Sequence, residues 1–99
     1  MLTKSEFLNE LKGLKDKNKL ITVNWGPKLY IKDVIIATYT IDLVITPHKV
    51  EAMPVRRLAC KLLKYGGNNC RMYIRSSNFF FIIGSVKEID KRLYLIYVC

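Results

Sequence analysis

The spacing of apolar residues changes along this chain, and the order of those changes limits the folds open to it. Residues 4–15 carry an apolar residue every three to four positions, which predicts a helix with one apolar face. From residue 20 the chain is rich in β-branched residues, and a second helical spacing begins at residue 55. Further strand-like segments follow. Because strands come in runs between single helices, the pattern predicts an α+β fold rather than a doubly wound parallel sheet.

The first helix also has a start signal. Thr3 and Glu6 have the spacing of a capping box, in which the threonine hydroxyl accepts from a free helix N–H and the glutamate accepts from the threonine N–H. The expected apolar face has four members: Phe7, Leu8, Leu11 and Leu14. Gly13 weakens the end of this helix.

Three strands are predicted before the second helix. Residues 20–25 form the first and Gly26-Pro27 ends it as a turn, and residues 29–32 form the second. In residues 34–46 the odd positions are apolar and most even positions from 38 onward are threonine or aspartate, which predicts one half-buried strand. Pro47 ends that strand.

The second helix is predicted after Pro54, which suits the first turn because its missing N–H costs little there. Its apolar side consists of Val55, Leu58, Ala59, Leu62 and Leu63. Its basic side consists of Arg56, Arg57, Lys61 and Lys64, with Cys60 among them. Gly66 and Gly67 then stop the helix.

The C-terminal part predicts a hairpin and a last strand. Residues 71–75 and 79–83 are the hairpin strands, residues 86–92 a polar connector or one helical turn, and residues 93–98 the final strand. We therefore expect one domain over residues 1–99 in the order α-β-β-β-α-β-β-β, with two helices on one face of a mainly antiparallel sheet. Residues 79–83 are apolar on both faces, which fits a covered central strand or a homodimer interface.

Charge is the strongest clue to a partner. Seventeen Lys and Arg residues against eight Asp and Glu give a net charge of +9, and a field of this sign attracts nucleic acid, anionic lipid or an acidic protein surface. The alternative is that the charge only keeps the domain dispersed in water. A hydrophobic fraction of 51% is ample for one core.

Seven residues could form one cationic surface. The basic side of the second helix precedes a strand in which two arginines flank a tyrosine, so helix and strand are predicted to share a patch that holds phosphates and stacks a base. Its members are Arg56, Arg57, Lys61, Lys64, Arg71, Tyr73 and Arg75. The competing interpretation is that these are the ordinary water-facing sides of an amphipathic helix and a half-buried strand.

Two aromatic residues are candidates for a protein interface. Trp25 stands at the Gly26-Pro27 turn and Tyr30 follows it, and an exposed tryptophan at a turn is a common anchor for a partner. Either residue could equally cap one end of the sheet core.

Catalytic and metal-binding patterns are sparse. His48 is the only histidine, the three cysteines form no CxxC pair, and no phosphate loop or hydrolase motif occurs, so we expect no metal and no cofactor. Unpaired cysteines favour a reducing cytoplasm. We expect no signal peptide and no membrane span. Residues with AT-rich codons dominate, which hints at a virus or mobile element as the source, with the host cytoplasm as its site of action.

The stretch from residue 55 to residue 98, a basic helix followed by strands bearing Arg71, Tyr73 and Arg75, resembles small ribonuclease toxins of the bacterial RelE/ParE type. That resemblance implies a toxin in which a basic helix packs on a sheet, and the exposed cationic face of the sheet meets nucleic acid or a target enzyme. The three strands before the second helix depart from the toxin pattern.

Three functions follow from these patterns. The first is a non-enzymatic module that binds nucleic acid or a nucleoprotein. The second is a viral or mobile-element protein that blocks a host defence complex. The third is a metal-independent ribonuclease.

Overall fold

The computed structural model describes residues 2–14, 16, 18–23, 29–76, 80–89 and 92–98. The chain forms, in order, α1 (Lys4–Lys12), β1 (Ile21–Val23), β2 (Tyr30–Ile36), β3 (Thr40–Thr46), the short 3-10 helix η1 (Lys49–Glu51), α2 (Val55–Lys64), β4 (Arg71–Arg75), β5 (Phe80–Ile89) and β6 (Arg92–Val98). The α+β class and the predicted order of helices and strands are confirmed.

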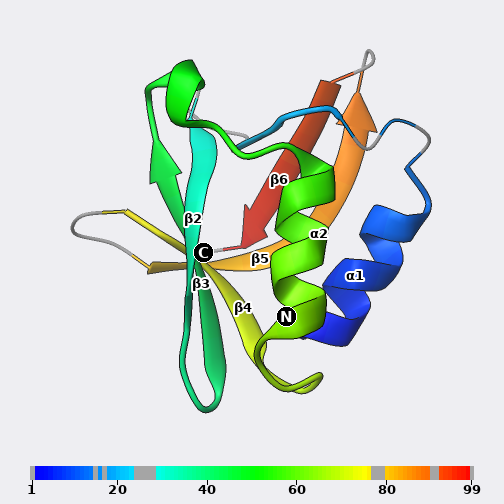
Figure 1. The fold of residues 1–99 in the computed structure, drawn as a ribbon, viewed down its shortest axis with the longest axis vertical. Helices are drawn as coiled ribbons and strands as arrows, with labels where there is room; N and C mark the ends of the chain where they lie inside the picture. The colour runs from blue at the N-terminus through cyan, green and yellow to red at the C-terminus, as the bar shows by residue number, and fades with distance from the viewer. Residues whose placement is uncertain are drawn as a thin grey trace.

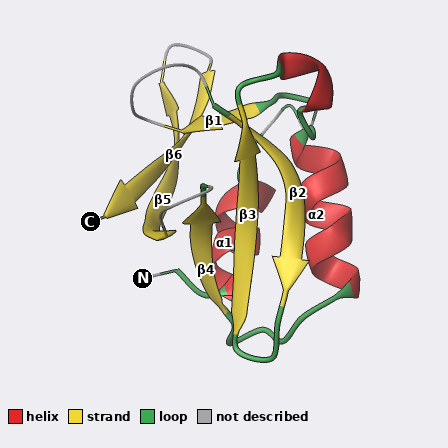
Figure 2. Cartoon of the chain, turned by 90° about the vertical axis from the view of Figure 1, so that its left-hand side faces the viewer, coloured by secondary structure: helices red, strands yellow, loops and turns green. Residues whose placement is uncertain are grey.

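The described strands form a ring in which each strand pairs with the next, and β6 pairs with β1 to close it. Pairing is antiparallel except between β3 and β4 and between β1 and β6, which run parallel. The sheet is strongly curved, and both helices lie on the concave side of its β2–β5 part (Figure 1). Figure 2 shows β2, β3 and β4 side by side with both helices behind them. The predicted placement of the helices on one face of a mainly antiparallel sheet is confirmed.

The core lies between the helices and this face of the sheet. Phe7 and Leu11 of α1 meet Leu58 and Leu62 of α2, all of them fully buried. Each such side chain stabilises the fold by roughly 1.5–3 kcal/mol through the apolar surface it removes from water. The sheet contributes fully buried residues from five strands: Ile21, Ile31, Ile41, Leu43, Met72, Ile74 and Ile83.

Both helices begin where the sequence predicts. The Thr3 hydroxyl accepts from the Glu6 N–H, and the Glu6 carboxylate accepts from the Thr3 N–H, so the capping box is formed. Pro54 is the N-cap of α2. After α2 the chain turns at Gly66, whose φ of +81° is a conformation that favours glycine.

The segment 34–46 is a hairpin, and the prediction of one continuous strand is wrong. A turn at residues 37–39 separates β2 from β3, and it contains no Gly, Pro or Asn to mark it. Even-numbered Val34 and Ile36 pack on the core, whereas Ile35 is exposed and odd-numbered Ile41 and Leu43 are buried. Core-facing residues are therefore even-numbered before the turn and odd-numbered after it. A single strand with strict alternation cannot have this arrangement.

The predicted connector over 86–92 is also wrong, because β5 continues to Ile89 and pairs with β6 along most of its length. A register shift between Ile83 and Ser85 changes which residues face the core. The apolar run before it is not covered on both faces: Ile83 is fully buried, while the Phe80 side chain is 61% exposed. Phe79 lies outside the described residues.

The N-terminal residues bind the C-terminal half of the sheet. The Leu2 N–H donates to the Ile83 carbonyl (3.2 Å), and the Leu2 carbonyl accepts from the Met72 N–H (3.0 Å). The Lys4 N–H donates to the Cys70 carbonyl (2.8 Å). Residues 2–4 are thus hydrogen-bonded to β4, to the residue before it and to β5, all of which lie about 70 to 80 positions later in the sequence.

Candidate nucleic-acid interface

The cations of α2 face away from the sheet. Arg56, Arg57 and Lys64 are exposed, and in the described part of the chain none of them forms an ion pair. Lys61 instead binds Asp33 of β2, with 3.0 Å between Nζ and Oδ1. The hydrogen bond from Lys61, reinforced by one from the Val34 N–H, lowers the pKa of Asp33. One predicted phosphate-binding cation is therefore already paired.

The cations of β4 lie on the other side of the sheet. Met72 and Ile74 are fully buried in the same core as the inner face of α2, so the alternating residues Arg71, Tyr73 and Arg75 point to the face without helices. The helix–sheet core separates the two groups of cations. The single contiguous patch expected from the sequence is therefore not formed, because one group faces outward from the helices and the other outward from the sheet.

We call the second surface the outer face and define it by side chains of β3, β4 and β5 that share register positions: Asp42, Val44, Arg71, Tyr73, Arg75, Phe80 and Ile82. Tyr73 stands between Asp42 on one neighbouring strand and Ile82 on the other. Arg75 stands between Val44 and Phe80 in the same way. Two arginines and two aromatic rings thus occupy adjoining positions.

Arg75 has two contacts on the outer face. Its guanidinium lies 5.4 Å from the centroid of the Phe80 ring, a cation–π distance, and its Nη1 lies 3.8 Å from Oδ2 of Asp42. Burial raises the pKa of Asp42, and the charge of Arg75 opposes that rise. Arg71 forms no ion pair with any described residue.

Sequence reasoning missed Phe80 and Asp42 as neighbours of Arg75. Phe80 was part of an apolar run, and Asp42 was one of several polar residues in a predicted strand. The β4–β5 hairpin offered a signal for Phe80, because antiparallel strands joined by a short turn place nearby residues opposite each other. The parallel pairing that brings Asp42 to β4 has no such local signal.

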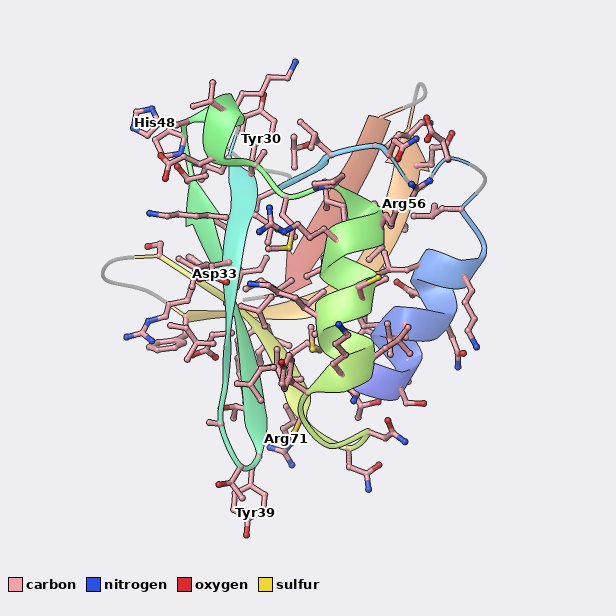
Figure 3. All side chains as sticks on the ribbon, viewed as in Figure 1. Tyr30, Asp33, Tyr39, His48, Arg56 and Arg71 are labelled. Atoms are coloured by element: carbon pink, nitrogen blue, oxygen red, sulfur yellow. The ribbon has the colours of Figure 1, made fainter. Side chains whose placement is uncertain are left out.

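A hollow of about 560 Å³ opens at one end of the outer face. Three segments line it: the β2–β3 turn, the loop after α2 and the start of β4. The lining residues are Thr38, Tyr39, Thr40, Gly67, Asn68, Asn69, Cys70, Arg71 and Tyr73. Figure 3 shows Tyr39 at the tip of the hairpin with Arg71 at the same end of the molecule.

The predicted interface anchors are not confirmed. Tyr30 is only 8% exposed, so the fold itself encloses its side chain and leaves little of it for a partner to contact. This burial fits the alternative interpretation, in which Tyr30 caps one end of the sheet core. Trp25 lies outside the described residues.

His48 and Cys60 lie on different elements of the fold. His48 is exposed near η1 at the end of the molecule opposite Arg71 and Tyr39 (Figure 3). Cys60 is exposed on α2. Among the described residues, no group of three His, Cys, Asp or Glu side chains is placed to hold a metal ion. Neither described helix is long and apolar enough to cross a membrane.

The fold and the outer face define a small basic α+β protein with an arginine- and aromatic-bearing sheet surface. Comparison with protein-family models, with curated proteins and with solved structures finds no match to this chain.

Proposed function

We propose that this protein is a non-enzymatic module that binds single-stranded nucleic acid across its outer face. The observation that carries the proposal is the strip of Arg71, Tyr73, Arg75 and Phe80 on adjacent strands of a sheet surface that neither described helix covers. Strand-binding proteins combine cations along a groove or surface with aromatic rings on which bases stack.

Each part of the strip has a role in this proposal. Arg71, which has no acidic partner among the described residues, contacts phosphate. Phe80 is 61% exposed, and the Arg75 guanidinium lies over its ring, so a base can stack on this pair of flat groups. A single strand, whose bases are free to turn toward the protein, suits this surface better than a duplex does.

The net charge of +9 supports the same partner class, because it attracts polyanions from a distance. The net charge does not show whether the outer face or the basic side of α2 binds the nucleic acid.

A matched pair of variants distinguishes these two surfaces. Arg71→Gln/Arg75→Gln removes two charges from the outer face, and Arg56→Gln/Lys64→Gln removes two exposed charges from α2.

The test measures fluorescence anisotropy of labelled single strands of about 12 nucleotides, DNA and RNA in separate arms, over a range of salt concentrations. The outer-face variant should bind much more weakly, with a salt slope smaller by about 0.7, because Arg71 is the cation assigned to phosphate and each lost phosphate contact on a single strand contributes about 0.7. The α2 variant should bind nearly as the wild type does. Equal losses in both variants, or a larger loss in the α2 variant, would contradict the outer-face proposal.

An apolar groove between the helices favours a second candidate, a protein partner such as the host complex considered above. Leu8 of α1 and Ala59 and Leu63 of α2 line the groove, and Leu63 is 68% exposed. Pull-down with nuclease-treated lysate tests this candidate. A stoichiometric partner that is retained by the wild type and lost with Leu63→Ser supports it, and the same partner retained by Leu63→Ser counts against the groove.

A further inference from the structure

We propose that the hollow at the end of the outer face holds one nucleotide of the bound strand and discriminates between bases through the side-chain amides of Asn68 and Asn69. This inference rests on the proposed single-strand binding, and it adds base preference to it. Arg71 and Tyr73 belong to both the outer face and the hollow, so a strand lying along β4 leads directly into it.

The size of the hollow fits such a ligand. Its volume of about 560 Å³ falls within the range of roughly 300–1,000 Å³ that is usual for small-ligand sites. A nucleotide is a ligand of this class, with a flat base, a sugar and one phosphate.

The frame of the hollow is held by backbone contacts. The Arg71 N–H donates to the Tyr39 carbonyl (3.0 Å), and the Cys70 N–H donates to the Gly67 carbonyl (3.1 Å). The Ser5 N–H of α1 donates to the Asn68 carbonyl (3.1 Å), and the Cys70 thiol contacts the Thr38 carbonyl (3.6 Å). These contacts join the hairpin turn to the loop after α2, so the site is built before a ligand arrives.

The side chains that line the frame remain available. Asn68 and Asn69 are exposed, and neither side-chain amide is hydrogen-bonded within the described part of the chain. Each amide offers a donor and an acceptor side by side, the pattern that recognises a base edge. The ring of Tyr39 is 80% exposed at the rim, where it can stack on the base.

The charge of the hollow selects for an anion. Arg71 is its one charged lining residue, and no carboxylate is among the residues that line it. A phosphate on Arg71 places the attached base between the amides of the loop and the ring of Tyr39. A neutral or cationic ligand would leave the arginine without a partner.

The experiment compares labelled homopolymers of dA, dC and dT of about 12 nucleotides, a length within known single-strand site sizes. Wild-type affinities should differ by about tenfold between the best and the worst homopolymer, the value of one good side-chain-to-base pairing. Asn68→Ala/Asn69→Ala should compress that range to about twofold, mainly by weakening the best ligand. The matched control, Asn9→Ala/Asn18→Ala, changes two exposed asparagines outside the hollow and should keep the preference.

A second variant separates stacking from base recognition. Tyr39→Ala should weaken all three homopolymers by a similar factor of about ten, because stacking does not depend on the base. Wild-type binding without base preference, or a preference that survives loss of both amides, overturns the inference while single-strand binding stands. Absence of binding to these homopolymers and to the corresponding RNA homopolymers overturns the proposed function and this inference together.

Discussion

The Nζ of Lys4 donates to the carbonyl of Gly66 at 2.7 Å, and the Lys4 side chain is buried, with only 4% of its surface exposed. A weaker contact of 3.4 Å reaches the Tyr65 carbonyl. Both acceptors lie just after the last turn of α2, where helix carbonyls lack partners and the helix dipole favours a cation. The first residue of α1 therefore caps the end of α2.

Replacing Lys4 by Met should lower the free energy of unfolding by about 1.5–3 kcal/mol, because a charge-assisted hydrogen bond is lost at a buried position. Urea denaturation measures the loss. Lys12→Met, at an exposed position in the last turn of α1, is the control and should change stability little. Equal stability of the Lys4 variant and the wild type would mean that water replaces the ammonium group.

Replacing Gly66 by Ala should destabilise the protein by about 1–3 kcal/mol, because the added Cβ requires a strained backbone. That Cβ would also lie 3.0 Å from Cδ1 of Ile41 and 3.3 Å from Cγ2 of Ile36. Gly13→Ala is a matched control with opposite expectation. Gly13 has a φ of −71°, and its nearest contact would be 3.6 Å, so alanine there should be neutral or stabilise by about 0.4–1 kcal/mol. Thermal melts in which the Gly66 variant matches the Gly13 variant would refute the argument.

Removing the carboxylate of Glu10 should also cost stability. Its Oε2 accepts from the Val86 N–H at 2.6 Å, next to the register shift in β5. Glu10→Ala leaves that N–H without its acceptor and should cost about 1–3 kcal/mol, whereas Glu10→Gln keeps an acceptor oxygen and should cost less. Hydrogen exchange at the Val86 amide gives a direct readout, with faster exchange expected for Ala than for Gln. Identical exchange in both variants would show that this acceptor does not protect the amide.

Asp42 and Asp33 should respond to pH with opposite signs. Burial raises the pKa of Asp42, so its protonated form favours folding, and that advantage is lost as the pH rises through the folded-state pKa. Asp42→Asn should therefore raise stability at neutral pH and have little effect in acid. The bond from Lys61 lowers the pKa of Asp33, which adds stability above the unfolded-state pKa and loses it as the pH falls through the folded-state pKa.

Asp33→Asn should accordingly lower stability at neutral pH, by a small amount because the ion pair is exposed, and should lower it less in acid, as the pH falls toward the folded-state pKa. Urea midpoints for both variants at about pH 3 and pH 7, on either side of the usual carboxyl pKa, measure the two signs. A loss of stability in Asp42→Asn at pH 7 would show that attraction to Arg75 outweighs the cost of burial.

Features encoded locally could be predicted from the sequence. The capping box at Thr3 and Glu6 and the Pro54 start of α2 depend on residues a few positions apart, and both occur as expected. The turn at residues 37–39 could not be found, because it lacks the residues that usually mark a turn. Without that turn, the sequence pattern could not show that the core-facing residues change from even positions, such as Ile36, to odd positions, such as Ile41.

The candidate site was harder to predict because it depends on pairing between distant segments. The outward direction of Arg71, Tyr73 and Arg75 follows from strand alternation, with both arginines exposed and Tyr73 half-buried. Their separation from the α2 cations depends on which face of β4 the helix covers. The position of Asp42 depends on the parallel β3–β4 register, which only the folded chain displays.

The pairing of β1 with β6 has a consequence for how the chain folds during synthesis. Ile21 pairs with the position of Leu93, so the ring cannot close until β6 has left the ribosome. Leu2 likewise waits for Met72 and Ile83 before its backbone groups find their partners. Contacts this distant in sequence slow folding. The N-terminal half therefore spends its synthesis with apolar strands uncovered, and nascent chains of this protein should depend on chaperones or on rapid release more than chains with local contacts do.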